Sequence, residues 1–428
     1  MNKPAARISC HIPFTCDTYG DDMEMKRQLT GPGATIVGVG SMIGAGLFAS
    51  FGPAASAAGG LLYLSLAIAA FIAFCNAASS AQLAAQYPTS GGTYMFGRAQ
   101  LGHWWGFIAG WCFLIGKTAS LGAMALTFGH YAAPDHSHIA AVAILIILAA
   151  INHLGIKRTA AATAVILTIT LISLAAVLIG GWSGRSPVTD SPLTDSSLLG
   201  VLQGAGLLFF AFAGYARLAT LGEEVKDPQR TIPRAIITAL TVVLALYALV
   251  AFTLVTLLGT AGLAGSSHPL ADIVDSPILN TVLTVGVSAA CAGSLLGLMA
   301  GIGRTGLAMA RDGDLPRPLS AVHRRGVPHR IDLIILAITI VLVLFVPLGG
   351  AIGFSSFGVL LYYSVTNASA FTQQTSWRRY PKALQVAGFA GCLILAFALP
   401  LASVLSGLGV VAAGIFLRLA VHGFRLKA

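Results

Sequence analysis

Long runs without a charged residue decide what this chain can fold into. Three of them, 160–181, 235–259 and 333–350, contain no Asp, Glu, Lys or Arg. Each run reaches the roughly 17–25 residues that a helix needs to cross the hydrocarbon core of a bilayer. Only helices and closed barrels satisfy the backbone there, and a barrel would show alternating segments of ~10 residues instead. The sequence therefore predicts an all-α polytopic membrane protein.

The overall composition agrees with lipid as the surrounding solvent. Charged residues make up 9% of the 428 residues and hydrophobic residues 56%, whereas a soluble domain averages roughly 25% charged residues. Pro400 divides the last apolar stretch into two. With that division the sequence predicts twelve transmembrane helices, near 33–52, 60–82, 103–129, 138–155, 160–181, 201–221, 235–259, 277–303, 332–350, 351–373, 383–399 and 402–420.

Basic residues outside the spans gather in alternate loops of this twelve-span order. They are Lys3, Arg7, Lys26, Arg27, Arg98, Lys157, Arg158, Lys226, Arg230, Arg234, those in 304–330, Arg378, Arg379, Lys382, Arg418, Arg425 and Lys427. The loops on the other side hold only Arg185. This positive-inside pattern predicts a multi-pass protein of the cell membrane with cytoplasmic N- and C-termini. It also explains the net charge of +10 without a nucleic acid partner.

Three regions follow from the span order. Residues 1–29 form a polar cytoplasmic tail without the apolar core of a signal peptide. Residues 30–374 hold a core of ten helices, and residues 375–428 hold two accessory helices and a short cytoplasmic C-terminus. Cys10, His11 and Cys16 in the tail could bind a metal, but incidental placement is the more frequent reading. The sequence predicts no metal site and no cofactor.

Glycine interrupts two spans that lie five spans apart. The first contains GVGSMIGAGLF at 38–48, and the sixth contains FFAFAGYA at 209–216. Glycine-interrupted spans at matching positions of two halves are typical of inverted-repeat transporters. The odd spacing would invert the second repeat, so spans 1–5 and 6–10 would form a 5+5 inverted repeat, with broken helices 1 and 6 and two peripheral helices.

A helix that breaks inside the membrane can bind a zwitterion without a charged side chain. The N–H groups at one side of a break attract a carboxylate, and the carbonyl groups at the other side suit an ammonium group. The predicted carboxylate-binding residues are Ser41, Met42, Ile43, Gly44, Ala45 and Gly46. The predicted amine-binding residues are Phe210, Ala211, Ala213 and Gly214.

Each motif also has a plainer explanation. Gly40-x-x-x-Gly44 is equally compatible with close helix packing. Gly38-x-Gly40 with Gly44 imitates a dinucleotide fingerprint, but that fingerprint needs a preceding strand and a βαβ unit. The aromatic cluster at 209–212 could face lipid or fill the core. The functional alternative is that one of its rings covers a bound substrate.

Four segments together resemble the amino acid–polyamine–organocation (APC) superfamily, especially bacterial amino acid permeases of its cationic-amino-acid-transporter-like branch. They are GSMIGAGLF at 40–48, YPTSGGTY at 87–94, FFAFAG at 209–214 followed by EEVKDPQRTIPR at 223–234, and AMARDGDLP at 308–316. The resemblance covers about residues 30 to 330. It implies a secondary transporter that moves an amino acid by alternating access around a central site, and it places Phe210 where relatives keep a gating aromatic residue.

Two positions depart from that resemblance. Thr170 stands where many proton-coupled members carry a lysine in the fifth span, so proton coupling by that route is in doubt. Ala216 stands where some relatives carry an acidic residue, which weakens an assignment to arginine or polyamines. The small residues Ala45, Ala211, Ala213 and Ala216 suggest a pocket for a neutral side chain.

Lys117 is a charged residue well inside a predicted span. It lies about fourteen residues past His103, roughly 20 Å along a helix. Burial disfavours the charged ammonium, so Lys117 is a candidate for a coupling proton. The alternatives are a structural lysine bound to helix-end carbonyl groups or one that reaches the headgroups.

For Arg217, just past the sixth-span break, the expected role is an ion pair with Glu223 or Glu224.

Three classes of function remain at this point. A secondary transporter, working as an exchanger or an ion-coupled permease, fits the broken spans best, with a polyamine or amine exchanger as a variant. A membrane-embedded enzyme would need clustered His, Asp, Glu or Ser around one cavity, and the spans are nearly bare of carboxylates. A sensor or channel on the same scaffold is the third, although no selectivity-filter ring is evident.

Overall fold

The computed structural model describes residues 29–88, 91–154, 160–188, 197–222, 224–323 and 327–425. These residues are almost wholly helical, and the sole extended pairing among them is one bridge between Leu29 and Val225. Within the described ranges, ten helices, broken ones included, are long and apolar enough to cross a membrane. They confirm an all-helical polytopic membrane protein. The tail residues Cys10, His11 and Cys16, the loop residues 89–90, and Glu223 lie outside the described residues.

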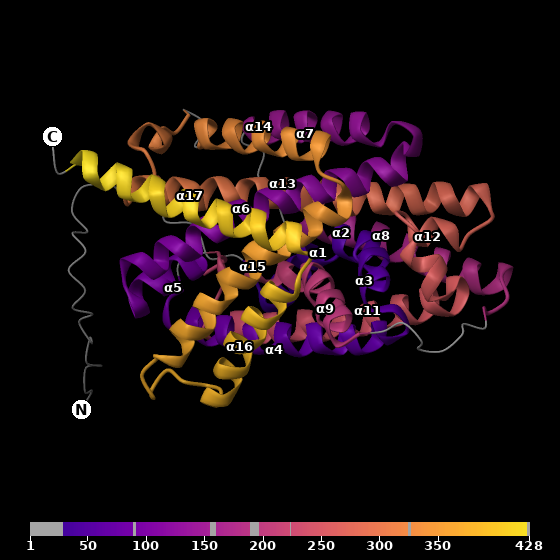
Figure 1. Cartoon of the computed structure of the whole chain (residues 1–428), viewed down its shortest axis with the longest axis horizontal. Coiled ribbons are helices and arrows are strands. Elements are labelled where there is room, and N and C mark those ends of the chain that lie inside the picture. Colours follow the sequence, from indigo (N-terminus) through magenta and orange to yellow (C-terminus); the bar gives the residue numbers. More distant parts are fainter. Residues whose placement is uncertain are drawn as a thin grey trace, which may run out of the picture.

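Figure 1 shows the helices coloured by their order along the chain. The first half consists of α1 (Gly31–Met42), α2 (Ala45–Ala49), α3 (Phe51–Ala58), α4 (Leu62–Gln86), α5 (Gly92–Leu101), α6 (His103–Ala132), α7 (Ser137–His153) and α8 (Ala160–Gly184). The second half consists of α9 (Leu198–Phe212), α10 (Ala216–Ala219), α11 (Pro228–Ala264), α12 (Pro269–Asp272), α13 (Pro277–Arg311), α14 (His329–Phe345), α15 (Leu348–Phe371), α16 (Lys382–Ala398) and α17 (Leu401–Arg425). Short 3₁₀ turns η1 (Gly59–Leu61), η2 (Pro134–His136), η3 (Ala213–Tyr215) and η4 (Arg317–Ser320) join some of them.

Every predicted span lies on one of these helices or on consecutive helices, but some boundaries were wrong. The predicted division at 350–351 is wrong, because α14 ends at Phe345 and Pro347 precedes α15. The division at Pro400 is confirmed, between α16 and α17. Helix α5 was missed, because its segment was taken for a loop. Since α14 and α16 have 17 residues each, the twelve-span count and the inverted repeat stay predictions.

Helices α6 and α15 form the centre of the molecule, where their backbones come close together. A Cβ atom added to Gly358 would lie 2.9 Å from the Cα atom of Gly116, so these two glycines permit the contact. Helix α13 packs against α6 and α8, while α4 packs against α9 and α11. Helices α7 and α14 lie side by side along one edge of the molecule, and α16 crosses the opposite side beside α4 (Figure 1).

A buried carboxylate joins three helices beyond the end of α13. Asp314 is 2% exposed; its Oδ2 lies 3.2 Å from Nη1 of Arg98, and its Oδ1 lies 3.0 Å from Nη2 of Arg418. The Tyr94 hydroxyl donates to Asp314 Oδ2 at 2.9 Å. Asp312 occupies the C-cap position of α13. The cluster fixes α5 and α17 to the C-terminal end of α13.

Asp314→Asn is expected to destabilise the folded protein by roughly 3–5 kcal/mol, the usual cost of removing one partner of a buried ion pair. The change removes the negative charge that lies between two guanidinium groups while keeping the side-chain shape. The melting temperature in detergent measures the effect. Asp275→Asn is the control, because the Asp275 side chain is 68% exposed in its pair with Arg185, and an exposed ion pair adds little to stability. Equal melting temperatures for both variants would contradict the structural role of Asp314.

Candidate functional site

The first predicted span is broken where its glycines predict. Helix α1 ends at Met42 and α2 begins at Ala45. Between them, Ile43 has φ −79° and ψ 96°, and Gly44 has φ −159° and ψ −146°, so neither residue is helical. Helix α2 continues through Ser50, which keeps helical angles, into α3. The break therefore has carbonyl groups at the end of α1 and N–H groups at the start of α2.

The sixth span is less interrupted than its glycine suggests. Helix α9 ends at Phe212, a single 3₁₀ turn follows at Ala213–Tyr215, and α10 resumes the helix. A 3₁₀ turn has hydrogen bonds between residues i and i+3, so the backbone stays hydrogen-bonded through this turn. The predicted break in the sixth span is therefore smaller than expected. The carbonyl groups in this turn nevertheless have contacts outside their own helix.

The two interruptions lie directly against each other. A Cβ atom added to Gly46 would lie 2.3 Å from the Cα atom of Ala211. A Cβ atom added to Gly214 would lie 2.2 Å from the carbonyl oxygen of Ser41. Both positions thus require glycine, because the neighbouring atoms belong to the backbone. Close packing accounts for Gly46 and Gly214, and it brings the predicted carboxylate-binding and amine-binding segments together.

Tyr247 of α11 connects the two interruptions. Its hydroxyl oxygen lies 2.7 Å from the carbonyl oxygen of Met42 and 2.9 Å from that of Ala211. A hydroxyl has one proton, so it donates to one of these carbonyl groups at a time. On the other side of the first break, the Ser294 hydroxyl lies 3.4 Å from the carbonyl oxygen of Ile43. Tyr247 and Ser294 could not be identified from the sequence, because an isolated tyrosine or serine in an apolar span is ordinary.

Lys117 reaches the sixth-span interruption from α6. Its ammonium donates to the carbonyl oxygen of Ala213 at 3.2 Å, and the side chain is 6% exposed. The Tyr363 hydroxyl lies 3.4 Å from the same oxygen. Of the two structural alternatives, the helix-end carbonyl contact is the one observed. Lys117 thus contacts the predicted amine-binding segment directly.

Other predicted residues lie away from this crossing or act differently. Thr170 of α8 is buried, and its hydroxyl oxygen lies 2.9 Å from the carbonyl oxygen of Ile166 and 3.3 Å from that of Gly286 on α13. The expected ion pair of Arg217 with Glu224 is not observed; Glu224 pairs with Arg304 at 3.7 Å, and Arg217 donates to Thr220.

The aromatic cluster of α9 belongs to the core. Phe209 and Phe212 are fully buried, and their rings pack against Tyr363 and Tyr247, with centroid distances of 5.8 and 5.1 Å. Phe210 is 7% exposed. The lipid-facing interpretation of this cluster was therefore wrong, whereas a gating role for Phe210 stays a prediction.

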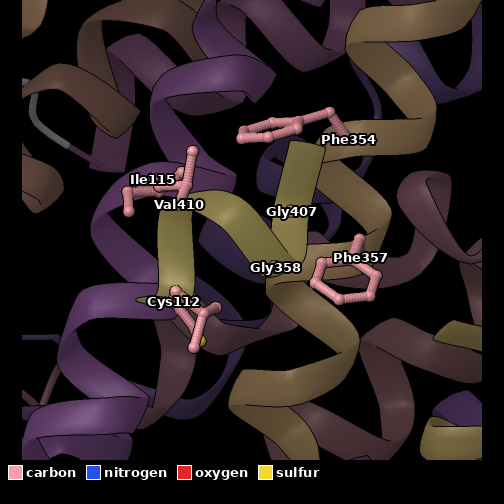
Figure 2. A pocket seen from close by; sticks show the side chains of 8 residues that line it. Cys112, Ile115, Phe354, Phe357, Gly358, Gly407 and Val410 are labelled. Atoms are coloured by element: carbon pink, nitrogen blue, oxygen red, sulfur yellow. The ribbon is translucent and has the colours of Figure 1, made fainter. Parts of the chain in front are cut away.

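A small hollow between α6, α15 and α17 does not resemble a substrate site. Its lining includes Cys112, Phe354 and Phe357 (Figure 2), and its volume is about 10 Å³. That volume is no larger than one water molecule requires. The apolar lining offers no partner for the charged groups of an amino acid.

The comparisons with known proteins agree with the geometry. An amino acid permease family model matches residues 33–421. An uncharacterised transporter of Mycobacterium tuberculosis is 49% identical over 408 residues, covering 94% of this chain and 92% of that protein. A branched-chain amino acid permease of Bacillus subtilis is 28% identical over 335 residues, 71% of each chain, and a serine/threonine exchanger of the same organism is 25% identical over 323 residues, 71% and 73% of the two chains. The chain therefore belongs to the amino acid permease family of the APC superfamily.

Proposed function

We propose that this permease is a secondary transporter that moves a neutral amino acid by alternating access around the crossing of α1/α2 with α9/η3. In this proposal the chain has twelve spans, with the 5+5 inverted repeat within residues 30–374, in the cell membrane with both termini cytoplasmic. The observation that carries the proposal is the contact between the two helix interruptions. Their facing backbone groups can bind both ends of a zwitterion while the neighbouring helices move.

The carboxylate is assigned to the start of α2. The N–H groups at Gly44, Ala45 and Gly46 begin a helical segment that continues into α3, and a helix start favours an anion. In this structure Gly46 lies against Ala211, so the two interruptions must separate before the substrate can reach these groups. That requirement supports a transporter whose site opens and closes, as in alternating access.

The ammonium group is assigned to the carbonyl groups of Ala211 and Ala213. These oxygens have Tyr247 and Lys117 as donors in this structure. An arriving substrate ammonium would take the place of the Lys117 ammonium at Ala213. The displaced lysine can then release its proton to the side on which the site is open. Lys117 therefore links substrate occupancy to proton movement. In this proposal it acts in place of the fifth-span lysine of many proton-coupled members, where this chain has Thr170.

Neutral amino acids are the proposed substrates because the residues around the crossing are small and uncharged. Ala45, Ala211, Ala213 and Ala216 are buried there, and none of them can pair with a cationic side chain. The named relatives support the same choice, since one is a branched-chain amino acid permease and another a serine/threonine exchanger. A polyamine or amine exchanger would need an acidic partner for its second charge.

Purified protein in liposomes tests the proposal. Uptake of radiolabelled leucine, valine, serine and threonine is measured with and without an internal amino acid, and with an imposed proton or sodium gradient. We expect uptake of at least one neutral amino acid, and weaker uptake of arginine and putrescine. Faster uptake of arginine or putrescine would overturn the substrate class.

Two other outcomes would favour the alternatives. Binding without transport, seen as thermal stabilisation by an amino acid in a protein that moves no label, would indicate a sensor on the same scaffold. Chemical conversion of the added amino acid would indicate an enzyme. Neither transport nor stabilisation by any amino acid would contradict the proposed site itself.

A further inference from the structure

A second and larger cavity lies between α7 and α14. Its volume is about 390 Å³, and α6 and α13 form its inner wall. The cavity is amphipathic along its length. Asn152, His329 and Asp332 line the end near the start of α14, and Leu121, Ile146 and Leu336 line the remainder. Such a shape fits a ligand with a polar head and an apolar body.

Two buried polar atoms at the polar end lack a partner. Asp332 Oδ2 accepts a hydrogen bond from Asn152 Nδ2 at 3.0 Å. Asp332 Oδ1 and His329 Nδ1 have no hydrogen-bond partner in the described part of the chain. A buried acceptor without a donor costs on the order of 1–3 kcal/mol, and more when it is charged. The site therefore favours a ligand that carries a positively charged N–H donor.

The fold makes room for this carboxylate. Asp332 Oδ1 points at Gly303 of α13, where an added Cβ atom would lie 2.3 Å from that oxygen. The Asn152 amide holds the other oxygen, so the orientation of the carboxylate is fixed from two sides. An acidic residue at the start of a span is costly in lipid. Here α7 and α13 surround the carboxylate, through Asn152 and Gly303.

The ligand most accessible to this cavity comes from the bilayer. The outer faces of α7 and α14 are apolar and exposed: Ile146 is 51% exposed, Ile147 54% and Leu333 60%. The polar end lies at the start of α14, directly after the basic segment 304–330, which the sequence predicts to be cytoplasmic. A lipid of the cytoplasmic leaflet would therefore have its headgroup at the depth of Asp332 and its acyl chain beside the apolar wall.

We propose that this cavity binds a phospholipid whose headgroup is a primary ammonium, of the phosphatidylethanolamine class. The ammonium pairs with the carboxylate of Asp332, which lines the polar end of the cavity beside His329. An acyl chain covers Ile146 and Leu336. A choline headgroup carries no N–H group, so the site distinguishes phosphatidylethanolamine from phosphatidylcholine even when both have the same chains.

The test compares full-length protein in nanodiscs of phosphatidylcholine alone and of phosphatidylcholine with phosphatidylethanolamine of identical acyl chains. We expect the wild type to melt at a higher temperature when phosphatidylethanolamine is present. Asp332→Asn should melt at the same temperature in both nanodiscs, and the control Asp275→Asn should keep the wild-type difference. No lipid dependence in the wild type, or a full dependence in Asp332→Asn, would overturn the proposal, because a general bilayer effect persists without the carboxylate.

A second variant keeps the test decisive if Asp332→Asn does not fold. Ala149→Phe places a ring in the apolar part of the cavity while leaving the carboxylate unchanged, and it should also remove the lipid-dependent difference. Free ethanolamine, added to wild-type protein in phosphatidylcholine nanodiscs, separates a membrane ligand from a soluble amine. A shift with ethanolamine as large as the one with the lipid would overturn the assignment to a phospholipid.

Discussion

Lys117→Met should abolish amino acid uptake that is driven by a proton gradient, reducing it to the level of protein-free liposomes, while amino acid exchange continues. The reason lies in the contact between the Lys117 ammonium and the carbonyl oxygen of Ala213. Methionine has a similar length but no proton to release, so the substrate still reaches the site and its occupancy no longer moves a proton. The measurement is radiolabel uptake with an imposed gradient, beside exchange against an internal amino acid.

Two matched variants separate proton release from loss of the contact. Lys117→Arg keeps a cationic donor that does not lose its proton in proteins, so it should lose gradient-driven uptake as Lys117→Met does. Lys382→Met removes a lysine whose ammonium lies over the Phe371 ring, far from the site along the chain, and should transport normally. If Lys117→Met retains the wild-type response of uptake to pH and to the gradient, Lys117 has no coupling role.

Gly46→Ala and Gly214→Ala should each eliminate transport. The added methyl groups would meet Ala211 Cα at 2.3 Å and the Ser41 carbonyl oxygen at 2.2 Å, and backbone atoms cannot move aside alone. Each variant must therefore push α1/α2 and α9/η3 apart, at a cost on the order of 1–3 kcal/mol or more. Uptake in liposomes and the melting temperature of the purified protein measure the two effects.

Gly409→Ala is the matched control for these substitutions. Gly409 lies on α17, and no atom comes within 4 Å of an added Cβ there. The substitution replaces a helical glycine, so it should keep full transport and an unchanged or slightly higher melting temperature. Wild-type transport by Gly46→Ala would show that the close contact between the interruptions is unnecessary for function.

The membrane helices could be predicted because lipid imposes their composition. A run such as 235–259 has few alternatives once water is excluded, and α11 is helical along it as far as Gly259, where the backbone leaves helical angles (φ 69°, ψ 167°). The end of α14 could not be predicted in the same way. Val346, Pro347 and Leu348 are as apolar as the helices around them, so hydropathy does not detect the end of the helix. Proline marks the boundary only through its missing N–H group.

The candidate site could be predicted in part, for a related reason. Gly44 and Gly214 stand out in sequence because they interrupt spans at matching positions of the two halves, and Lys117 stands out because a charge inside a span is costly. Tyr247 could not be identified, because its partners are the carbonyl groups of Met42 and Ala211, and every residue has a carbonyl group. Only the folded chain shows which of them come within reach of a given hydroxyl.

Tyr247 also bears on how easily the two interrupted spans slide past one another. Its single proton can bond either carbonyl oxygen, at 2.7 or 2.9 Å. Rotation of one hydroxyl exchanges one bond for the other and leaves the number of hydrogen bonds unchanged. A small displacement of α1 relative to α9 therefore meets little resistance from this tyrosine, which keeps the spans associated without fixing their register.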